Sequence, residues 1–324
     1  MVHDSDAGQR MKKTVQILGV VATAGMFIVL VMGATVTNTG SEHGCGKSWP
    51  LCHGQWIPQF AVRTFIEFSH RAVVAGETVL ILALAVGAVY LYRRRRSIQL
   101  LVPIMVLFLF LQAGLGAWAV MNPTSAPILA LHFGVSLVAF ASVLLTTVAV
   151  FQADLAMKPR LPQALRNFVF LLAGYTYVVV YLGAYVRHTN ADDACSGWPL
   201  CNGAVIPFLH GNVLIVFSHR FAAGILTLAV VGLVVWCRRY RAERPDVFWG
   251  SIAALAAVIL QVVAGAAIVF TDMDIFSALA HAALAGVLFS SLSYIWMQTL
   301  TARQPAVGRA YSQTASAADA LIIG

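Results

Sequence analysis

Eight apolar runs constrain this chain more than any other feature. A helix needs roughly 20 mostly apolar residues to cross a bilayer. Such runs occur at 15–36, 64–91, 99–121, 127–151, 165–186, 212–237, 247–270 and 276–300. Because backbone polar groups in hydrocarbon must be paired inside the protein, runs of this length predict a helical bundle and not a barrel. We therefore expect an all-α integral membrane protein with eight transmembrane helices.

The composition excludes an ordinary soluble domain. Hydrophobic residues make up 60% of the chain and charged residues 10%, against the roughly 25% charged residues of a soluble protein. The first run follows Lys12 and Lys13 and could imitate a signal peptide. Its apolar stretch is longer than the roughly 7 to 15 residues of a signal sequence, so we interpret it as a retained helix.

The basic residues predict the orientation, because Lys and Arg near helix ends stay on the cytoplasmic side. They precede the first run, follow the second, lie between the fourth and fifth, follow the sixth, and follow the eighth. Both termini are therefore expected in the cytoplasm. The formal net charge of +8 reports this topology and predicts acidic lipid headgroups as neighbours. We expect no nucleic-acid partner.

The chain is an internal duplication. The sequence W-P-L-C occurs at 49–52 and again at 198–201, an offset of 149 residues. The same offset relates Pro58 to Pro207, His70 to His219, Arg71 to Arg220, Gln112 to Gln261, Gly116 to Gly265 and His132 to His281. Before the loops the offset is 150, as in Gly33 and Gly183, so a single-residue insertion or deletion lies between.

Each copy contains four spans, an even number, so both copies enter the membrane in the same orientation. Parallel repeats of this kind are related by an axis along the membrane normal. We expect two tandem four-helix bundles, residues 1–157 and 158–324, related by a pseudo-twofold axis. The connection at 152–164, with Lys158, Pro159 and Pro162, is the predicted boundary.

Four histidines lie near the outer ends of apolar spans. His70 and His132 occur at similar depth in spans two and four, and His219 and His281 repeat them in the second copy. A single intramembrane histidine can be explained by an interhelical hydrogen bond. Four histidines, paired in depth and duplicated, favour a shared ligand between the helices of each pair.

Paired imidazoles favour heme iron over other metals. Zinc and copper sites want three or four close ligands, whereas two histidines on facing helices suit bis-axial ligation of a heme within a four-helix bundle. Neighbouring glycines could admit a flat macrocycle, although close helix packing would also explain them. They are Gly33, Gly114, Gly116, Gly134, Gly183, Gly265 and Gly286. Because all four histidines lie near one face, the pattern argues against a transmembrane electron wire.

One acidic residue distinguishes the two copies. Glu67 precedes His70 by three residues and shares its helix face, whereas Val216 occupies the equivalent position in the second copy. An ionisable residue at membrane depth is costly and is functional by default. A neighbouring hydroxyl, or a place at the wet end of the helix, would also explain it. We predict that Glu67 is catalytic and that the second half is supportive.

Other polar residues in and near the spans have alternative roles. Arg71 and Arg220 directly follow histidines and either reach for the outer interface or bind heme propionates through charge-assisted hydrogen bonds; the second is favoured. Glu77 has no partner that the sequence identifies. The remaining loop histidines are expected to be solvated rather than ligands. They are His43, His53, His188 and His210.

The cysteines predict two disulfides in the outer loops. Cys45 and Cys52 flank one W-P-L segment, and Cys195 and Cys201 flank the other. The outer compartment permits disulfides, and the spacing is not the C-x-x-C of a typical zinc site, so disulfides are favoured over zinc. Cys237 is expected to be unpaired and inert.

Taken together, these motifs resemble the heme A synthase family, in the bacterial form with cysteine pairs in both outer loops. The resemblance covers residues 18–296. It rests on C-G-K-S-W-P-L-C at 45–52, I-E-F-S-H-R at 66–71, A-L-H-F-G at 130–134, G-A-Y-V-R-H-T at 183–189, F-S-H-R at 217–220 and A-L-A-H at 278–281.

The resemblance implies a specific reaction and specific site residues. Successive hydroxylations would oxidise the C8 methyl group of heme O to a formyl group, giving heme A for terminal oxidases. His219 and His281 would ligate a resident heme b, His70 and His132 would hold the substrate heme, and Glu67 would assist the oxidation. The family also implies a bacterial plasma membrane, with a heme O synthase and an external electron donor as possible partners.

Two other classes of function remain as alternatives. A non-enzymatic di-heme electron carrier or heme-handling protein would hold two hemes without altering them. A transporter built on parallel repeats would place polar residues and broken helices near the bilayer midplane, where this chain offers little besides Glu77.

Overall fold

The computed structural model describes residues 6–59, 61–122, 125–155 and 158–300, and this part of the chain is helical apart from its loops. The long helices are α1 (Asp6–Asn38), α2 (Val62–Tyr92), α3 (Arg96–Met121), α4 (Ala126–Gln152), α5 (Gln163–His188), α6 (Gly211–Cys237), α7 (Pro245–Phe270) and α8 (Ile275–Leu300). Two short 3-10 helices lie within the second half, η1 (Asp192–Ala194) between α5 and α6 and η2 (Arg238–Tyr240) between α6 and α7. Each of the eight long helices is long and apolar enough to cross a membrane. The predicted all-α, eight-span membrane protein is confirmed.

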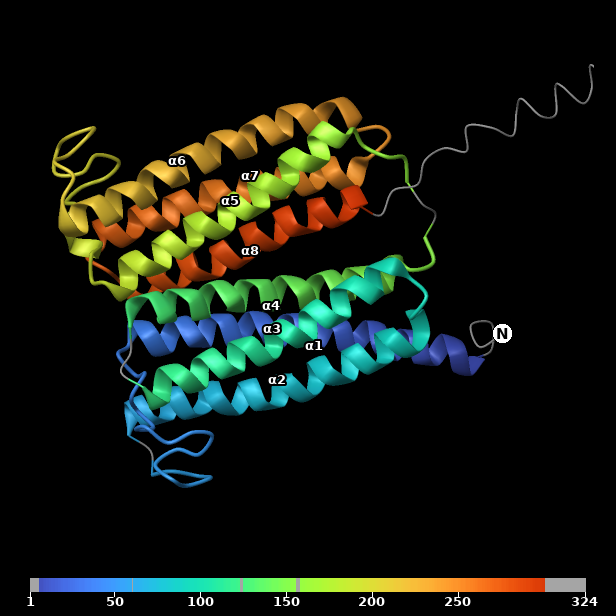
Figure 1. Cartoon of the computed structure of the whole chain (residues 1–324), viewed down its shortest axis with the longest axis horizontal. Coiled ribbons are helices and arrows are strands. Elements are labelled where there is room, and N and C mark those ends of the chain that lie inside the picture. The colour runs from blue at the N-terminus through green and yellow to red at the C-terminus, as the bar shows by residue number, and fades with distance from the viewer. Residues whose placement is uncertain (1–5, 60, 123–124, 156–157, 301–324) are drawn as a thin grey trace, which may run out of the picture.

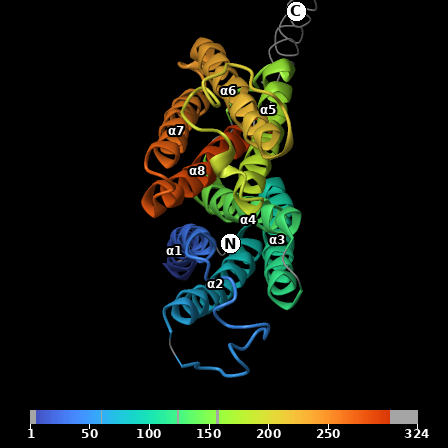
Figure 2. The same ribbon diagram turned by 90° about the vertical axis from the view of Figure 1, so that its left-hand side faces the viewer.

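Within each half, consecutive helices pack against one another and the first helix packs against the fourth (Figure 1). Helix α1 packs against α2 and α4, and α3 packs against α2 and α4; α5 to α8 repeat this pattern, with α5 packing against α6 and α8. The two groups meet through α1 and α4 on one side and α5 and α8 on the other (Figure 2). The pseudo-twofold axis stays a prediction, and the expected boundary adjoins Met157, which lies outside the described residues.

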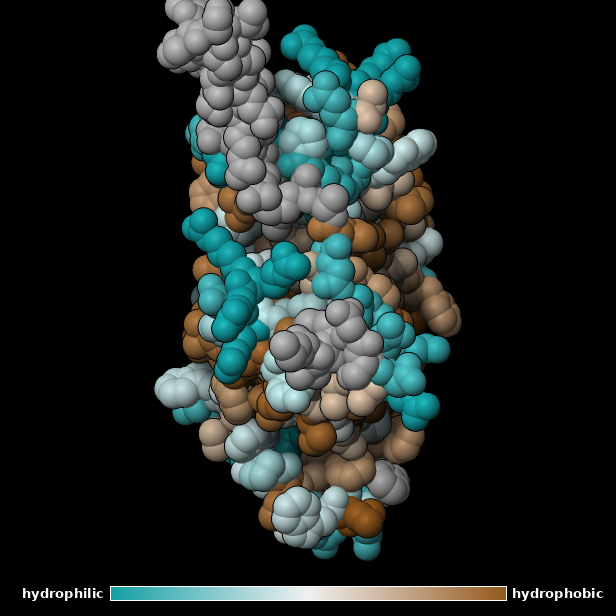
Figure 3. Space-filling view, turned by 90° about the vertical axis from the view of Figure 1, so that its right-hand side faces the viewer, coloured by the Kyte–Doolittle hydropathy of each residue, from teal (hydrophilic) through white to brown (hydrophobic). Residues whose placement is uncertain are grey.

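The two ends of the bundle differ in character. The long loops that follow α1 and α5 lie at one end, and the connections α2–α3 and α6–α7 lie at the other (Figure 1). Figure 3 looks onto this second end and shows many hydrophilic side chains. The arginines at 93–96 and Arg238, Arg239 and Arg241 are exposed. The basic clusters that predict orientation therefore share one end, opposite the cysteine loops.

A buried arginine at the basic end ties the connection between α4 and α5 to α7 and α8. Arg244 is 1% exposed, and its guanidinium donates to the Asp246 carboxylate at 3.0 and 3.1 Å. It also donates to the carbonyls of Pro159 and Gln298, each at 2.8 Å. Lys158 adds a second cation to Asp246 at 3.2 Å.

Replacing Arg244 should therefore destabilise the second half. Arg244→Ala removes the donor to the Pro159 and Gln298 carbonyls and leaves Lys158 as the cation beside Asp246, and breaking a buried ion pair costs about 3–5 kcal/mol. The midpoint of thermal unfolding in detergent should fall by several degrees. Arg241→Ala removes an exposed arginine nearby and should leave the midpoint unchanged; equal midpoints for the two variants would contradict the role of Arg244.

Candidate functional site

A single cavity of about 1670 Å³ opens among the helices of both groups. It is larger than the roughly 300–1,000 Å³ of a typical small-molecule pocket. All four histidines of the predicted pairs line it. The sequence predicts one histidine pair in each half, and both pairs line this cavity.

The histidines occupy matching positions on their helices. His70 and His219 are the ninth residues of α2 and α6, and His132 and His281 are the seventh residues of α4 and α8. At 1.5 Å per residue they lie roughly 9 to 12 Å along their helices. His70 and His132 are close enough to interact electrostatically, as are His281 and His219. The fold thus brings together the members of each predicted pair.

Each of these imidazoles lies against a glycine on the helix that precedes its own. A Cβ atom built on Gly183 would lie 2.7 Å from Cε1 of His219, and one on Gly265 would lie 3.1 Å from Cε1 of His281. The first half is looser: the corresponding distances are 3.5 Å from Gly33 to His70 and 3.4 Å from Gly116 to His132. The absent side chains make room for the rings.

The other glycines that the sequence singled out do not contact these imidazoles. A Cβ on Gly134 would meet the Tyr177 ring, and one on Gly286 would meet Leu30 and Phe140. A Cβ on Gly114 would have no neighbour within 4 Å among the described residues. At Gly134 and Gly286 the absent side chain instead allows close packing between helices of the two halves.

Both imidazoles of the second half are anchored by backbone carbonyls, whereas His70 of the first half is not. Nδ1 of His219 lies 3.1 Å from the carbonyl of Val179, and Nδ1 of His281 lies 3.0 Å from the carbonyl of Gln261. A proton donated from Nδ1 leaves the Nε2 lone pair free to bind a metal. In the first half, Nδ1 of His70 and of His132 is buried with no hydrogen bond to a described residue, although the Gln112 carbonyl lies near His132.

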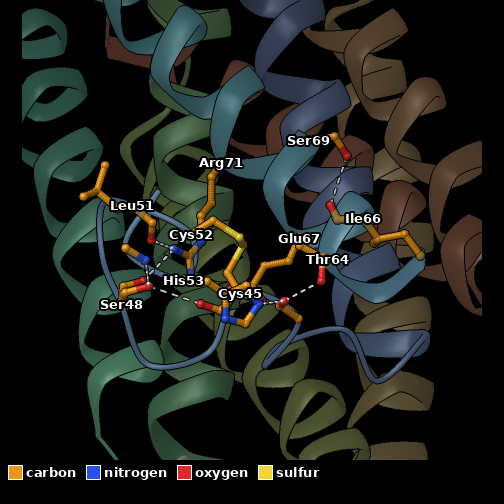
Figure 4. Close-up of a disulfide and its surroundings, with 12 residues drawn as sticks. Cys45, Ser48, Leu51, Cys52, His53, Thr64, Ile66, Glu67, Ser69 and Arg71 are labelled. Atoms are coloured by element: carbon orange, nitrogen blue, oxygen red, sulfur yellow. Dashed lines mark hydrogen bonds and ion pairs between the residues drawn. A yellow bond between two sulfur atoms is a disulfide. The ribbon is translucent and has the colours of Figure 1, made fainter. Parts of the chain in front are cut away.

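Glu67 is buried beneath the first cysteine loop (Figure 4). It is 3% exposed, it accepts a hydrogen bond from the Cys45 N–H at 2.7 Å, and it forms an ion pair with Arg71. It also lines the cavity. Among the described residues its partners are a backbone N–H and a guanidinium rather than a hydroxyl. Val216, its counterpart, packs in an apolar cluster with the cysteines of the second loop.

The arginines that follow two of the histidines hold the cysteine loops in place. Arg71 donates to the carbonyls of Ser48 and Leu51 at 2.9 and 3.0 Å (Figure 4). Arg220 makes the equivalent bonds to the carbonyls of Gly197 and Leu200 at 2.9 and 3.0 Å. The sequence did not predict this role, although both the arginines and the loops are duplicated. Their contact with heme propionates stays a prediction.

Both predicted disulfides are confirmed. Cys45 joins Cys52, with Cα atoms 4.5 Å apart, and Cys195 joins Cys201, with Cα atoms 4.7 Å apart. The shorter spacing of the second pair thus still closes. Cys237 is free and buried. Within the described ranges, no group of three or more His, Cys, Asp or Glu side chains could hold a metal ion, which leaves no site there for zinc bound by such a group.

The prediction for His188 is wrong. It is the last residue of α5, it is half-buried, it lines the cavity, and it interacts electrostatically with His132. The apolar run ends at Val186, but the helix continues for two more residues. His43, His53 and His210 lie exposed in loops as expected. Glu77 is buried, and its Oε1 has no hydrogen bond to a described residue.

Comparisons with known proteins agree along almost the whole chain. The COX15-CtaA family model, described as a cytochrome oxidase assembly protein, matches residues 16–293. A Geobacillus thermodenitrificans protein named heme A synthase is 38% identical over 314 residues, 95% of this chain and 99% of its own length. A Bacillus licheniformis heme A synthase is 42% identical over 290 residues, 88% of this chain and 95% of its own. The chain belongs to the COX15-CtaA family of cytochrome oxidase assembly proteins.

Proposed function

We propose that this protein is a heme A synthase, a membrane oxidoreductase that oxidises the C8 methyl group of heme O to a formyl group by successive hydroxylations. The carrying observation is a cavity that holds two histidine pairs, with a buried carboxylate, Glu67, beside only one of them. A di-heme electron carrier would not need this asymmetry. Full-length relatives with the name heme A synthase support the same function.

The second half is the proposed site of a resident heme b, ligated by His219 and His281. Anchored Nδ1 atoms fix both rings and leave each Nε2 available, as a permanent cofactor requires. The first half, residues 1–157, is the proposed substrate site, with His70 and His132 as ligands. A ligand without such an anchor, His70, suits a porphyrin that must enter and leave.

Glu67 is the proposed catalytic residue at the substrate site. Bound iron porphyrin supplies the redox chemistry there. The Cys45 N–H and Arg71 hold the carboxylate on the cavity wall, about one helical turn from His70. Oxidation of a methyl group to a formyl group releases protons, and a fixed carboxylate can accept them as a general base.

The proposed topology places the active side outward. Residues 1–157 and 158–324 would form parallel repeats. Both termini would then lie in the cytoplasm of a bacterial cell, with the disulfide loops and heme sites toward the outer side of the plasma membrane. The arginines at 93–96 and Arg238, Arg239 and Arg241 support this orientation. A heme O synthase and an external electron donor are the proposed partners.

Product analysis tests the proposed function. The protein would be expressed in cells that make heme O but lack heme A, and the membranes would be extracted for porphyrins. If the protein is a heme A synthase, heme A should appear in extracts of cells that express it and should be missing from extracts of cells that do not. Extracts that contain only unaltered heme b and heme O would support the electron-carrier alternative instead.

A matched glycine pair tests the resident-heme site. Gly183→Ala would push its Cβ to 2.7 Å from His219, closer than real Cβ contacts, and overpacking of this kind costs about 1–3 kcal/mol. Affinity for heme b should fall about tenfold. Less heme b should therefore copurify, measured as heme absorbance per purified protein. Gly33→Ala, with its Cβ at an ordinary 3.5 Å from His70, should leave resident heme unchanged. Equal heme loss in both variants would count against the assignment.

A further inference from the structure

The outer end of α5 contributes side chains to the wall of the shared cavity. Arg187 and His188 both line it. Arg187 donates from Nε to Oδ1 of Asn38 on α1 at 3.2 Å, which joins the two halves. His188 lines the cavity together with His132 of α4, and α4 packs against α5. A helix of the second half therefore reaches the histidine pair of the first half.

The three cavity arginines differ in the contacts that hold them. The first half's own cavity arginine, Arg71, is ion-paired with Glu67 and bonded to the first loop. Arg220 is bonded to the second loop. Arg187 is the remaining arginine among the described lining residues. At the 150-residue offset its counterpart is Thr37, and that of His188 is Asn38. The basic pair Arg187 and His188 is therefore not repeated in the first half.

We propose that Arg187 and His188 bind a propionate carboxylate of the porphyrin held between His70 and His132. The inference rests on the proposed function and names the residues that recognise its substrate's acidic groups. The first-half site is then complete only with a helix of the second half. Both groups lie at the outer helix end, where the polar edge of a porphyrin would face water.

The contacts of Arg187 leave it able to bind an anion. Arg187 forms an ion pair with Asp192, but its Nη1 lies 3.4 Å from Oδ2 of that carboxylate, which is long for a charge-assisted hydrogen bond of about 2.7–2.9 Å. The two contacts named above use its Nε and Nη1. Its Nη2 makes no hydrogen bond to a described residue. The cavity wall also carries the carboxylates of Glu42, Asp192 and Asp193, which repel a propionate. Arg187 must offset them, and a guanidinium can do so by bidentate bonding.

Porphyrins with and without free carboxylates test the proposal. Purified full-length protein that retains its resident heme would be titrated with hemin and with hemin dimethyl ester, and binding at the second site followed by difference absorbance. In Arg187→Gln, hemin should bind about tenfold more weakly or worse, while the ester binds as it does to wild type. Arg63→Gln, which removes an exposed arginine at the outer start of α2, should change neither affinity.

A second variant tests the propionate assignment independently of Arg187→Gln. Asp192→Asn frees Arg187 and should tighten hemin binding several-fold without changing ester binding, so it reports even if Arg187→Gln loses its resident heme. Equal losses for hemin and ester, or no loss for either, would overturn the propionate assignment alone. A wild-type protein that binds neither porphyrin at a second site would overturn the proposed function together with it.

Discussion

Glu67→Gln is expected to abolish heme A formation while both porphyrin sites stay occupied. Glutamine matches the size of glutamate and can still accept the Cys45 N–H that Glu67 accepts at 2.7 Å. It cannot accept a proton as a carboxylate does, and general acid–base catalysis contributes typically 10²- to 10⁴-fold in rate. Heme A formed per purified protein should fall by about that factor, with heme b retained and heme O accumulating.

The second half supplies a control for this substitution. Val216 occupies the equivalent position and packs against the second disulfide, so Val216→Ala should perturb that loop and leave heme A formation near wild type. Thiol labelling would show whether the Cys45–Cys52 disulfide survives in Glu67→Gln. Undiminished heme A from Glu67→Gln would mean that the carboxylate only fastens the loop.

His219→Ala is expected to remove the resident heme. The substitution deletes an imidazole that the Val179 carbonyl orients and that a glycine accommodates, and it leaves His281 as a lone ligand. Heme b per protein should fall close to zero, and heme A formation should disappear with it. His53→Ala, in an exposed loop position, should retain full heme b content.

The first-half histidines should respond differently. His70→Ala removes a proposed substrate ligand whose Nδ1 has no hydrogen bond to a described residue. Resident heme b should remain, and bound heme O and heme A should be lost. If His70→Ala and His219→Ala lost the same pigment, the assignment of one cofactor site and one substrate site would be wrong.

Much of this site can be predicted from sequence because the duplication is nearly exact in its spacing. The offset that relates His70 to His219 also aligns Glu67 with Val216, so both the paired ligands and the single acid follow from alignment of the two copies. Depth along an apolar run then places each histidine, since rise per residue in a helix is fixed. These inferences need only local structure and repetition.

The remaining features depend on tertiary structure that no local pattern encodes. The bonds from Arg71 to the Ser48 and Leu51 carbonyls exist because the loop folds back over α2. His188 lines the same cavity as His132 because α5 packs on α4, and an offset between copies gives no information on contacts across them. The same packing lets both histidine pairs line one cavity.

Extraction and mass analysis of the porphyrins bound to the purified protein tests the central claim most directly. Two histidine pairs that hold a cofactor and a substrate predict heme b together with heme O or heme A from the same preparation. Heme b alone, at two per chain and unaltered in the presence of a heme O source, would contradict it.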